Sequence, residues 1–353
     1  MGSRRIRLLF GLSLVVALLA LTGAASGETT QFSDALIVGT TQGPDVSLVE
    51  LVSIDNGIIG NVELDIPAGY ALDPPQLGAK LADVIVVTRA GGLATGALTV
   101  ADPASYTDPA VLACDSQTHV AVWSMTVDGT SDNVPWFVDA VATGGYAVHV
   151  CLPAAQFGGG ATATPLAAVI AEFDGTLHSP TTAGTYLWHG LVTPFGADGQ
   201  TLDPASEIDY QAAVPVPVAL TMKVSYNAQT KLATVSGRLT LANQPGAGYS
   251  LDIGAAASLD SGVVSDLGSA VTTADGTFTY QVAALKSEYL FADPEPEQSP
   301  CTSAVTGDAC FSTVFPLAEA SAHLIVTKPK PKPKPVPKCK KGQKSTKKHR
   351  CHT

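Results

Sequence analysis

Short runs of alternating apolar and polar residues recur from residue 46 to residue 327. Successive side chains of a strand point to opposite faces, so this two-residue period predicts strands with one buried face. Between the N-terminal segment and the C-terminus, no apolar pattern keeps a helical period beyond about two turns. The predicted strands are 46–54, 62–66, 84–88, 119–127, 136–142, 146–152, 169–173, 185–192, 220–226, 232–241, 249–253, 277–282 and 323–327.

Tight turns between the runs predict antiparallel pairing. Asp55-Asn56-Gly57, Thr143-Gly144-Gly145 and Asp275-Gly276 are typical of residues that close hairpins. Val and Thr are plentiful, whereas Lys, Arg and Glu, which favour helices, are scarce in this part of the chain. The sequence therefore predicts an all-β protein of antiparallel, immunoglobulin-like β-sandwiches.

The chain is too long for one ordinary sandwich, and the predicted boundary between two tandem sandwiches lies near residue 215. Residues 196–209 are polar and turn-rich, and the alternating valines and prolines of 214–218 are expected to interrupt a strand ladder. The predicted parts are a signal peptide (1–27), a first sandwich (28–215), a second sandwich (216–327) and a disordered basic tail (328–353).

The first 27 residues are organised like a secretory signal. Arg4, Arg5 and Arg7 precede an apolar run over 8–21, and small residues follow that run. The run is too short for a comfortable membrane span, so the sequence predicts a secreted protein. An uncleaved membrane anchor is the alternative interpretation of this segment.

An even number of cysteines agrees with export to an oxidising compartment. Six cysteines allow fifteen pairings, and we predict disulfides between those closest in sequence. These pairs are Cys114 with Cys151, Cys301 with Cys310, and Cys339 with Cys351. Because His119 and His149 flank the first pair, a metal site is the competing interpretation, but the spacing fits no zinc motif. We therefore predict no metal and no cofactor.

Part of the second predicted domain resembles a known family. The segments 235–240, 244–248 and 271–280 are similar to the carboxypeptidase-regulatory-like, or prealbumin-like, sandwich repeat. The resemblance covers residues 218–284 and implies an accessory, adhesion-type module without catalytic residues. Cys114 and the segments 119–123, 135–139 and 151–153 lie in the first predicted domain. Through them this domain is similar, more faintly, to uncharacterised exported proteins of high-GC Gram-positive bacteria, and that likeness implies no particular function.

Alternation after the Asp275-Gly276 turn predicts part of the core of the second domain. Phe278 and Tyr280 are expected on the core-facing side of one strand, together with Val235 and Leu239 of another strand.

Histidines and carboxylates are the candidate catalytic residues. Four histidines could gather around an aspartate, but no nucleophile motif, zinc-protease motif or phosphate-binding loop accompanies them. We therefore predict that the protein is not an enzyme. The candidates are His119, His149, His178, His189, Asp139 and Asp174.

Two loops and three tryptophans are candidates for ligand binding. Residues 128–133 and 198–203 gather oxygen atoms that suit calcium, although neither loop matches the twelve-residue calcium motif. Solvated turns are the preferred interpretation of both loops. Trp123, Trp136 and Trp188 could form a sugar-stacking platform, and burial in the core is preferred for all three.

Charge is distributed very unevenly along the chain. All 31 acidic residues and only six basic ones lie between the N-terminal segment and the tail, which gives this part a net charge of about −25. In the tail, lysine alternates with proline over 328–335, a pattern that favours an extended polyproline rod. The basic residues of the tail are Lys328, Lys330, Lys332, Lys334, Lys338, Lys340, Lys341, Lys344, Lys347, Lys348 and Arg350.

The charge pattern and the signal segment together predict where the protein acts. A basic arm on an acidic body favours electrostatic attachment to anionic cell-wall polymers or lipid headgroups. We predict a cell-surface protein with a structural or binding, adhesion-type role and no specific nucleic-acid partner. A carbohydrate or protein ligand is left open, and a tail that only solubilises the protein is the alternative for that segment. The alternative function is an extracellular hydrolase or a cation-dependent carbohydrate-binding protein.

Overall fold

The computed structural model describes residues 35–41, 46–52, 58–73, 76–90, 92–106, 119–128, 133–160, 163–173, 175–259, 263–284, 286–295, 297–300, 302–303 and 311–327. The predicted signal peptide and basic tail lie outside these residues. Strands dominate the described part of the chain, which confirms the all-β prediction. No helix in the described part is long and apolar enough to cross a membrane.

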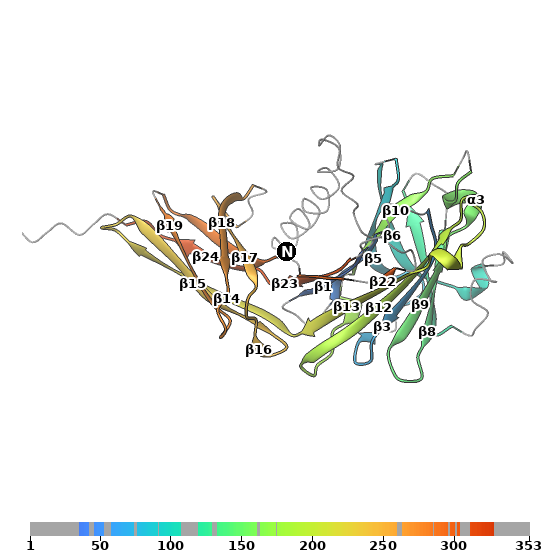
Figure 1. The fold of residues 1–353 in the computed structure, drawn as a ribbon, viewed down its shortest axis with the longest axis horizontal. Helices are drawn as coiled ribbons and strands as arrows, with labels where there is room; N and C mark the ends of the chain where they lie inside the picture. The colour runs from blue at the N-terminus through green and yellow to red at the C-terminus, as the bar shows by residue number, and fades with distance from the viewer. Residues whose placement is uncertain are drawn as a thin grey trace, which may run out of the picture.

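Two lobes follow one another along the chain (Figure 1). The first lobe consists of residues 35–216, and the second lobe of residues 218–295 together with 318–327. The elements of the first lobe are β1 (Ala35–Thr41), β2 (Val46–Val52), β3 (Ile58–Ile66), β4 (Ala71–Leu72), β5 (Lys80–Thr88), β6 (Leu93–Ala101), η2 (Pro103–Ser105), β7 (Ala121–Val127), β8 (Asn133–Ala140), β9 (Tyr146–Cys151), α3 (Ala154–Phe157), β10 (Leu166–Phe173), β11 (Leu177–His178), β12 (Gly184–Phe195), η3 (Pro204–Ser206) and β13 (Ile208–Val216).

The second lobe and the segment inserted into it contain only strands among the described residues. They are β14 (Val218–Asn227), β15 (Leu232–Leu241), β16 (Gln244–Pro245), β17 (Ser250–Ala256), β18 (Ser265–Val271), β19 (Thr277–Ala283), β20 (Glu288–Pro294), β21 (Glu297–Pro300), β22 (Thr302–Ser303), β23 (Phe311–Leu317) and β24 (Ala320–Leu324).

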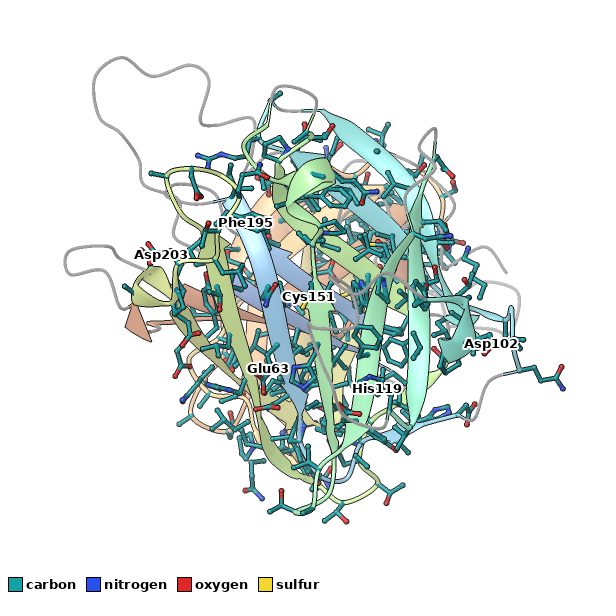
Figure 2. All side chains as sticks on the ribbon, turned by 90° about the vertical axis from the view of Figure 1, so that its right-hand side faces the viewer. Glu63, Asp102, His119, Cys151, Phe195 and Asp203 are labelled. Carbon is teal, nitrogen blue, oxygen red and sulfur yellow. The ribbon has the colours of Figure 1, made fainter. Side chains whose placement is uncertain are left out.

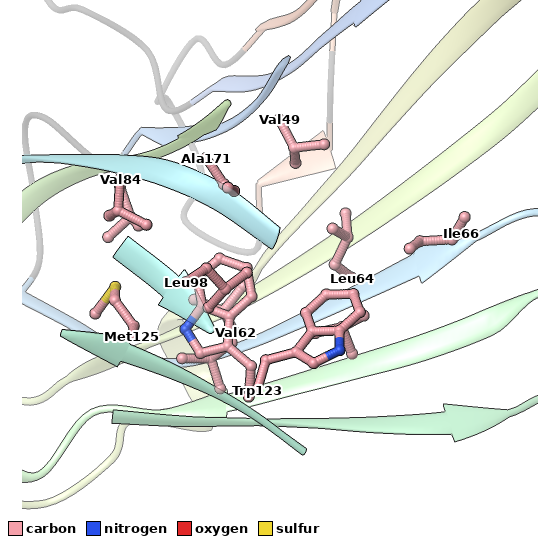
Figure 3. Close-up of a cluster of buried hydrophobic side chains, with 14 of the residues drawn as sticks. Val49, Val62, Leu64, Ile66, Val84, Leu98, Trp123, Met125 and Ala171 are labelled. Carbon is pink, nitrogen blue, oxygen red and sulfur yellow. The ribbon is translucent and has the colours of Figure 1, made fainter. Parts of the chain in front are cut away.

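One large sheet builds the first lobe. Its strand order is β21-β23-β1-β2-β10-β5-β6-β7-β8-β9-β3-β12-β13-β22. The sheet bends back on itself, because β1 near one end lies close to β13 near the other. Side chains from both halves therefore share one core, part of which Figure 3 shows. In it, Trp123 of β7 meets Phe173 of β10 edge-on. The two layers of this sandwich are thus one continuous hydrogen-bonded sheet.

Alternation along β3 shows how the sequence positions the outer face of this sheet. Val62, Leu64 and Ile66 are buried in the core, whereas Glu63 and Asp65 lie between them and point to the other side. The neighbouring strand β9 matches this pattern, because Val148 and Val150 face the core. Polar side chains of adjacent strands are thereby brought together on the outer face.

The sequence predicts that the valine–proline segment near residue 215 interrupts a strand. The structure shows that it does not. Strand β13 continues through Pro215, which lies opposite Thr185 of β12. Among the described residues, the other side of β13 pairs with β22 only at Ile208 and Asp209, so no described neighbour on that side needs an N–H from Pro215. The cis bond between Val216 and Pro217 then leads directly into β14.

The second lobe is a sandwich of two sheets with its own core. One sheet has the order β14-β15-β16 with β19 paired to β15, and the other has the order β18-β17-β20-β24. Val235 and Leu239 are completely buried, and Phe278 is 2% exposed. Tyr280 packs at the margin of this core, and its hydroxyl donates to the carbonyl of Leu267. The predicted core positions are therefore confirmed.

Two of the predicted turns have different roles. The Thr143-Gly144-Gly145 turn joins the paired strands β8 and β9, as predicted, and both glycines have positive φ. The Asp275-Gly276 turn does not close a hairpin, because β18 before it pairs with β17 and β19 after it pairs with β15. This turn instead carries the chain from one sheet of the sandwich to the other. Asp55-Asn56-Gly57 lies outside the described residues.

A segment from the C-terminal part of the chain joins the sheet of the first lobe. Strand β23 pairs in parallel with β1, β21 pairs with β23, and β22 pairs with the start of β13. These strands lie within the range predicted for the second sandwich, yet they hydrogen-bond in the first lobe. The chain therefore connects the lobes at Pro217 and again around β23.

Candidate functional site

A chain of alternating histidines and carboxylates runs across the outer face of the first lobe. Nδ1 of His119 lies 3.0 Å from Oδ1 of Asp139, and Oδ2 of Asp139 lies 4.0 Å from Nε2 of His149. Nδ1 of His149 lies 3.9 Å from Oε2 of Glu63. We call His119, Asp139, His149 and Glu63 the His119 chain; Figure 2 looks onto the sheet that bears Glu63 and His119.

The strand register explains why these residues meet. Glu63 of β3 lies directly opposite His149 of β9. Asp139 of β8 is a diagonal neighbour of His149, two residues beyond Phe137, which lies opposite that histidine. Residues opposite each other on antiparallel strands have neighbouring side chains, so opposite charges there attract. His119 comes just before β7, and its ring stacks on Phe137 of β8 at a centroid distance of 4.5 Å.

The inner end of the His119 chain is shielded from solvent. The side chains of His119 and Asp139 are each 12% exposed. A buried carboxylate requires partners, and an ionised carboxylate only accepts hydrogen bonds. Nδ1 of His119 must therefore carry the proton that it donates to Asp139, an assignment that follows from the hydrogen-bond network.

A second group, the His189 triplet, lies further along the same sheet. Nδ1 of His189 is 3.2 Å from Oδ2 of Asp65, and its Nε2 is 2.7 Å from Oδ1 of Asp209. Both ring nitrogens thus face carboxylates. The triplet links side chains of β3, β12 and β13 across the outer face of the sheet.

The remaining candidate histidine lies apart from these two groups. Nε2 of His178 on β11 is 3.1 Å from Oδ2 of Asp73, and both side chains are substantially exposed. The candidate Asp174 is outside the described residues. The four histidines therefore belong to three separate ion-pair groups and do not share one centre.

The described contacts of His119 and His189 are those of structural ion pairs. Their partners are carboxylates and, for His119, the ring of Phe137, so neither imidazole contacts a hydroxyl or thiol nucleophile there. An imidazole oriented by a carboxylate could accept a proton, but nucleophilic catalysis also requires an adjacent nucleophile. Within the described residues, no group of three or more His, Cys, Asp or Glu side chains is arranged to hold a metal ion.

Replacing His119 by alanine is expected to lower the free energy of unfolding of the first lobe by about 2–4 kcal/mol. The reason is that Asp139 would lose the hydrogen bond of 3.0 Å from His119 inside a shielded site. All three tryptophans lie in the first lobe, so urea unfolding followed by tryptophan fluorescence reports on it.

His178→Ala is the matched control, because its partner Asp73 is mostly exposed and exposed pairs contribute less than about 1 kcal/mol. Equal losses in the two variants would show that the His119 chain has no special structural role.

The carboxylates of the candidate calcium loop at 198–203 accept hydrogen bonds from residues of their own turns. Asp198 accepts from the backbone N–H groups of Gln200 and Thr201, each at 2.9 Å, and from the Thr201 hydroxyl at 2.7 Å. These bonds lower the pKa of Asp198 to about 2. Asp203 accepts from Ala205 and Ser206. These contacts are those of two self-contained turns, and the interpretation of the loop as solvated turns stays a prediction.

The other predicted loop lies largely outside the described residues. At its start, Asp128 accepts a hydrogen bond of 2.6 Å from the Thr95 hydroxyl of the adjacent strand.

The three tryptophans are core residues and not a sugar-binding platform. Trp123, Trp136 and Trp188 are 2%, 4% and 0% exposed. Trp188 packs edge-on against Tyr70 at a centroid distance of 5.0 Å, and burial raises the pKa of Tyr70 to about 12. The preferred interpretation of these aromatics is therefore confirmed.

Most of the other predicted site residues fall outside the described part of the chain. Cys151 ends β9 and is disulfide-bonded, but Cys114, its predicted partner, is not among the described residues, so the pairing stays a prediction. The same holds for the other two predicted disulfides and for the eleven basic residues of the tail.

The sequence indicated the histidines of the site but not most of their partners. Glu63, Asp65, Asp73 and Asp209 were not among the candidates. Glu63 and Asp65 gave one usable signal, because they alternate with core valine and leucine and must share the outer face of a strand. Which strand lies next to β3 is decided by long-range pairing, and one sequence does not reveal that.

Comparisons with known proteins supply no relative. No protein-family model matches the chain, and no curated protein is similar to it. The resemblance of residues 218–284 to the carboxypeptidase-regulatory-like module therefore stays a prediction about this part of the chain.

Proposed function

We propose that this is an exported cell-surface protein with a structural or binding role. It has no catalytic activity in this proposal, and its basic tail holds it on anionic wall polymers or lipid headgroups. The observation that carries the proposal is the separation of charge: a body of about −25 is followed by eleven basic residues with no acid among them. Such a tail attracts polyanions, whereas the body as a whole repels them.

The place where the tail begins suits this role. Strand β24 ends at Leu324, and the N–H of Val326 donates to the Ser287 hydroxyl in the second lobe. The basic residues start two positions later, at Lys328. The tail has almost no apolar side chains, so its removal would take little from either core.

Removing residues 328–353 is expected to release the protein from cells while both lobes remain folded. A full-length variant with the eleven tail Lys and Arg residues replaced by Gln separates charge from length and should be released equally. Attachment of the unaltered protein should weaken steeply with added salt, because exposed charges are screened over about 8–10 Å at physiological ionic strength.

The measurement is the fraction of protein that sediments with intact cell wall or with anionic vesicles at several salt concentrations. Circular dichroism checks that the variants are folded. If the neutral-tail variant stays bound as firmly as the unaltered protein, or if salt has no effect, electrostatic attachment through the tail is wrong.

A further inference from the structure

A stretch of the acidic body is free of acidic residues. Between Asp209 and Asp252 the sequence contains no Asp or Glu, but it contains Lys223, Lys231 and Arg238. These are three of the six basic residues that lie between the N-terminal segment and the tail. The stretch includes β14 and β15, and β19 beside them is also free of acids. One whole sheet of the second lobe is therefore neutral or basic along its strands.

The outer face of this sheet carries two cationic side chains surrounded by the hydroxyl groups of Ser and Thr residues. Lys223 on β14 lies opposite Ser236 on β15, which in turn lies opposite Thr279 on β19. In the next row, Arg238 of β15 lies between Thr221 and Thr277. Lys223 and Arg238 are thus diagonal neighbours, about 7–8 Å apart at their Cα atoms. Both side chains are long enough to reach one anionic group from two sides.

A shallow depression lies between these side chains. It has a volume of about 380 Å³ and is lined by Thr221, Met222, Lys223, Ser236, Gly237, Arg238, Thr277, Phe278 and Thr279. The lining offers hydroxyl donors and acceptors next to two positive charges, a combination that suits a polyol bearing phosphate or carboxylate.

Lys223 and Arg238, unlike Lys80 and Lys286, have no ionic partner among the described residues. Lys80 is paired with Asp83, and Lys286 lies 3.3 Å from Glu288. Lys223 and Arg238 are exposed and make no such contact within the described part of the chain. Asp275, just before the start of β19, accepts hydrogen bonds from the hydroxyls of Thr273 and Thr277 within its own turn. The positive charge of the face is therefore open to an external anion.

The opposite sheet of the same lobe carries acidic residues instead. Asp252 on β17 is close to Glu295 and Asp266. Partial burial, a hydrogen bond with Glu295 and the charges of both neighbours raise the pKa of Asp252 to about 6. The second lobe is thus polarised, with acids over one sheet and cations over the other. A polyanion near this lobe would be repelled from the sheet that contains β17 and drawn to the sheet of β14, β15 and β19.

We propose that the outer face of β14, β15 and β19 is a docking site for an anionic glycan polymer, with Lys223 and Arg238 binding its phosphate or carboxylate groups and the Ser and Thr hydroxyls binding its sugar hydroxyls. This inference rests on the proposed function and specifies the partner as a glycan. Strand β24, which leads to the tail, lies against β14 at the edge of this sheet. The tail and the face would therefore contact one polymer side by side.

The test compares full-length exported protein with Lys223→Gln, Arg238→Gln and the double variant. The probes are polygalacturonate and dextran sulfate, with neutral dextran as the uncharged comparison, and affinity is measured by titration calorimetry. We expect the double variant to bind both anionic glycans roughly three- to tenfold more weakly. The dependence of log affinity on log salt should become shallower by up to about one for each charge removed.

Lys286→Gln is the matched control, because it removes the same charge from the same lobe at a lysine that is already paired. It should change the affinity less than about twofold, as an exposed pair contributes little. Thermal unfolding of all variants should coincide, since the substituted side chains are exposed. Unchanged glycan affinity in the double variant, or a loss equal to that of the control, overturns the docking site.

Two further measurements distinguish a failure of this inference from a failure of the proposed function. If the double substitution weakens binding to phosphatidylglycerol vesicles but not to glycans, the partner class is wrong. In the neutral-tail variant, the residual glycan binding should fall further when Lys223 and Arg238 are also replaced. If the neutral-tail variant is not released but the Lys223 and Arg238 variants bind glycans more weakly, tail attachment is wrong and the docking site stays supported. If the tail variant is released but the Lys223 and Arg238 variants keep full affinity, the docking site is wrong and tail attachment stays supported.

Discussion

Replacing Phe278 by alanine is expected to lower the free energy of unfolding of the second lobe by about 3–5 kcal/mol. The ring is 2% exposed and belongs to the core formed by both sheets of this lobe. Removing it would take away buried apolar surface and leave a cavity that the surrounding strands fill only in part.

The packing around Phe278 explains why the site would relax poorly. The ring lies over Gly237 on the adjacent strand, so close that a Cβ added to Gly237 would be 2.6 Å from it and would also clash with the carbonyl oxygen of Thr221. Gly237 has no side chain that could move into the space left by the ring. The two neighbouring strands are also held by backbone hydrogen bonds, which restrict their approach.

The measurement for Phe278→Ala is chemical denaturation followed by circular dichroism, with hydrogen exchange at the amides of β15 and β19 as a local readout. Thr279→Ala is the control, because Thr279 is the next residue on the strand and points to solvent. It should cost less than about 0.5 kcal/mol. A loss below about 1 kcal/mol for Phe278→Ala would contradict the role assigned to this ring.

Replacing both Cys114 and Cys151 by serine is expected to lower the free energy of unfolding of the first lobe by roughly 3–4 kcal/mol. Their predicted disulfide closes the longest loop of the three predicted pairs, and cross-linking a longer loop removes more conformational freedom from the unfolded chain. Cys151 is positioned at the end of β9, next to the core residue Leu152.

The Cys301→Ser, Cys310→Ser variant is the control for this prediction. Its shorter loop should give a smaller loss, roughly 2–3 kcal/mol by the same relation. Non-reducing peptide mapping of the secreted protein tests the pairing directly. Free thiols, or a bond joining Cys151 to a cysteine other than Cys114, would refute the predicted pairs.

Short-range patterns were enough to predict the class of fold and much of the second core. Strand β15 begins and ends where the alternation of residues 232–241 predicted, and Val235, Leu239 and Phe278 face inward. The physical reason is local: a strand exposes its side chains to alternate faces, so burial of one face appears as a two-residue period in the sequence itself.

Local patterns failed where a neighbouring strand decides the outcome. Pro215 would interrupt β13 only if a neighbouring strand needed its missing N–H. Among the described residues, β13 has a paired neighbour at Pro215 on the β12 side alone, so the prolyl nitrogen can face away from the ladder. Likewise, the Asp275-Gly276 turn has hairpin residues, but it joins strands of different sheets. The conformation of a turn is encoded locally, whereas the partners of the strands that it connects are not.

By itself, the sequence determined that the chain forms strands, which side chains of many strands are buried, and that a basic tail follows an acidic body. Only the tertiary structure decided that β23 would join β1, that Glu63 would meet His149, and that Lys223 would lie diagonal to Arg238. Side-chain alternation and charge depend on the residues of one segment. Strand order and register depend on the whole chain, because they are selected by the burial that all strands achieve together.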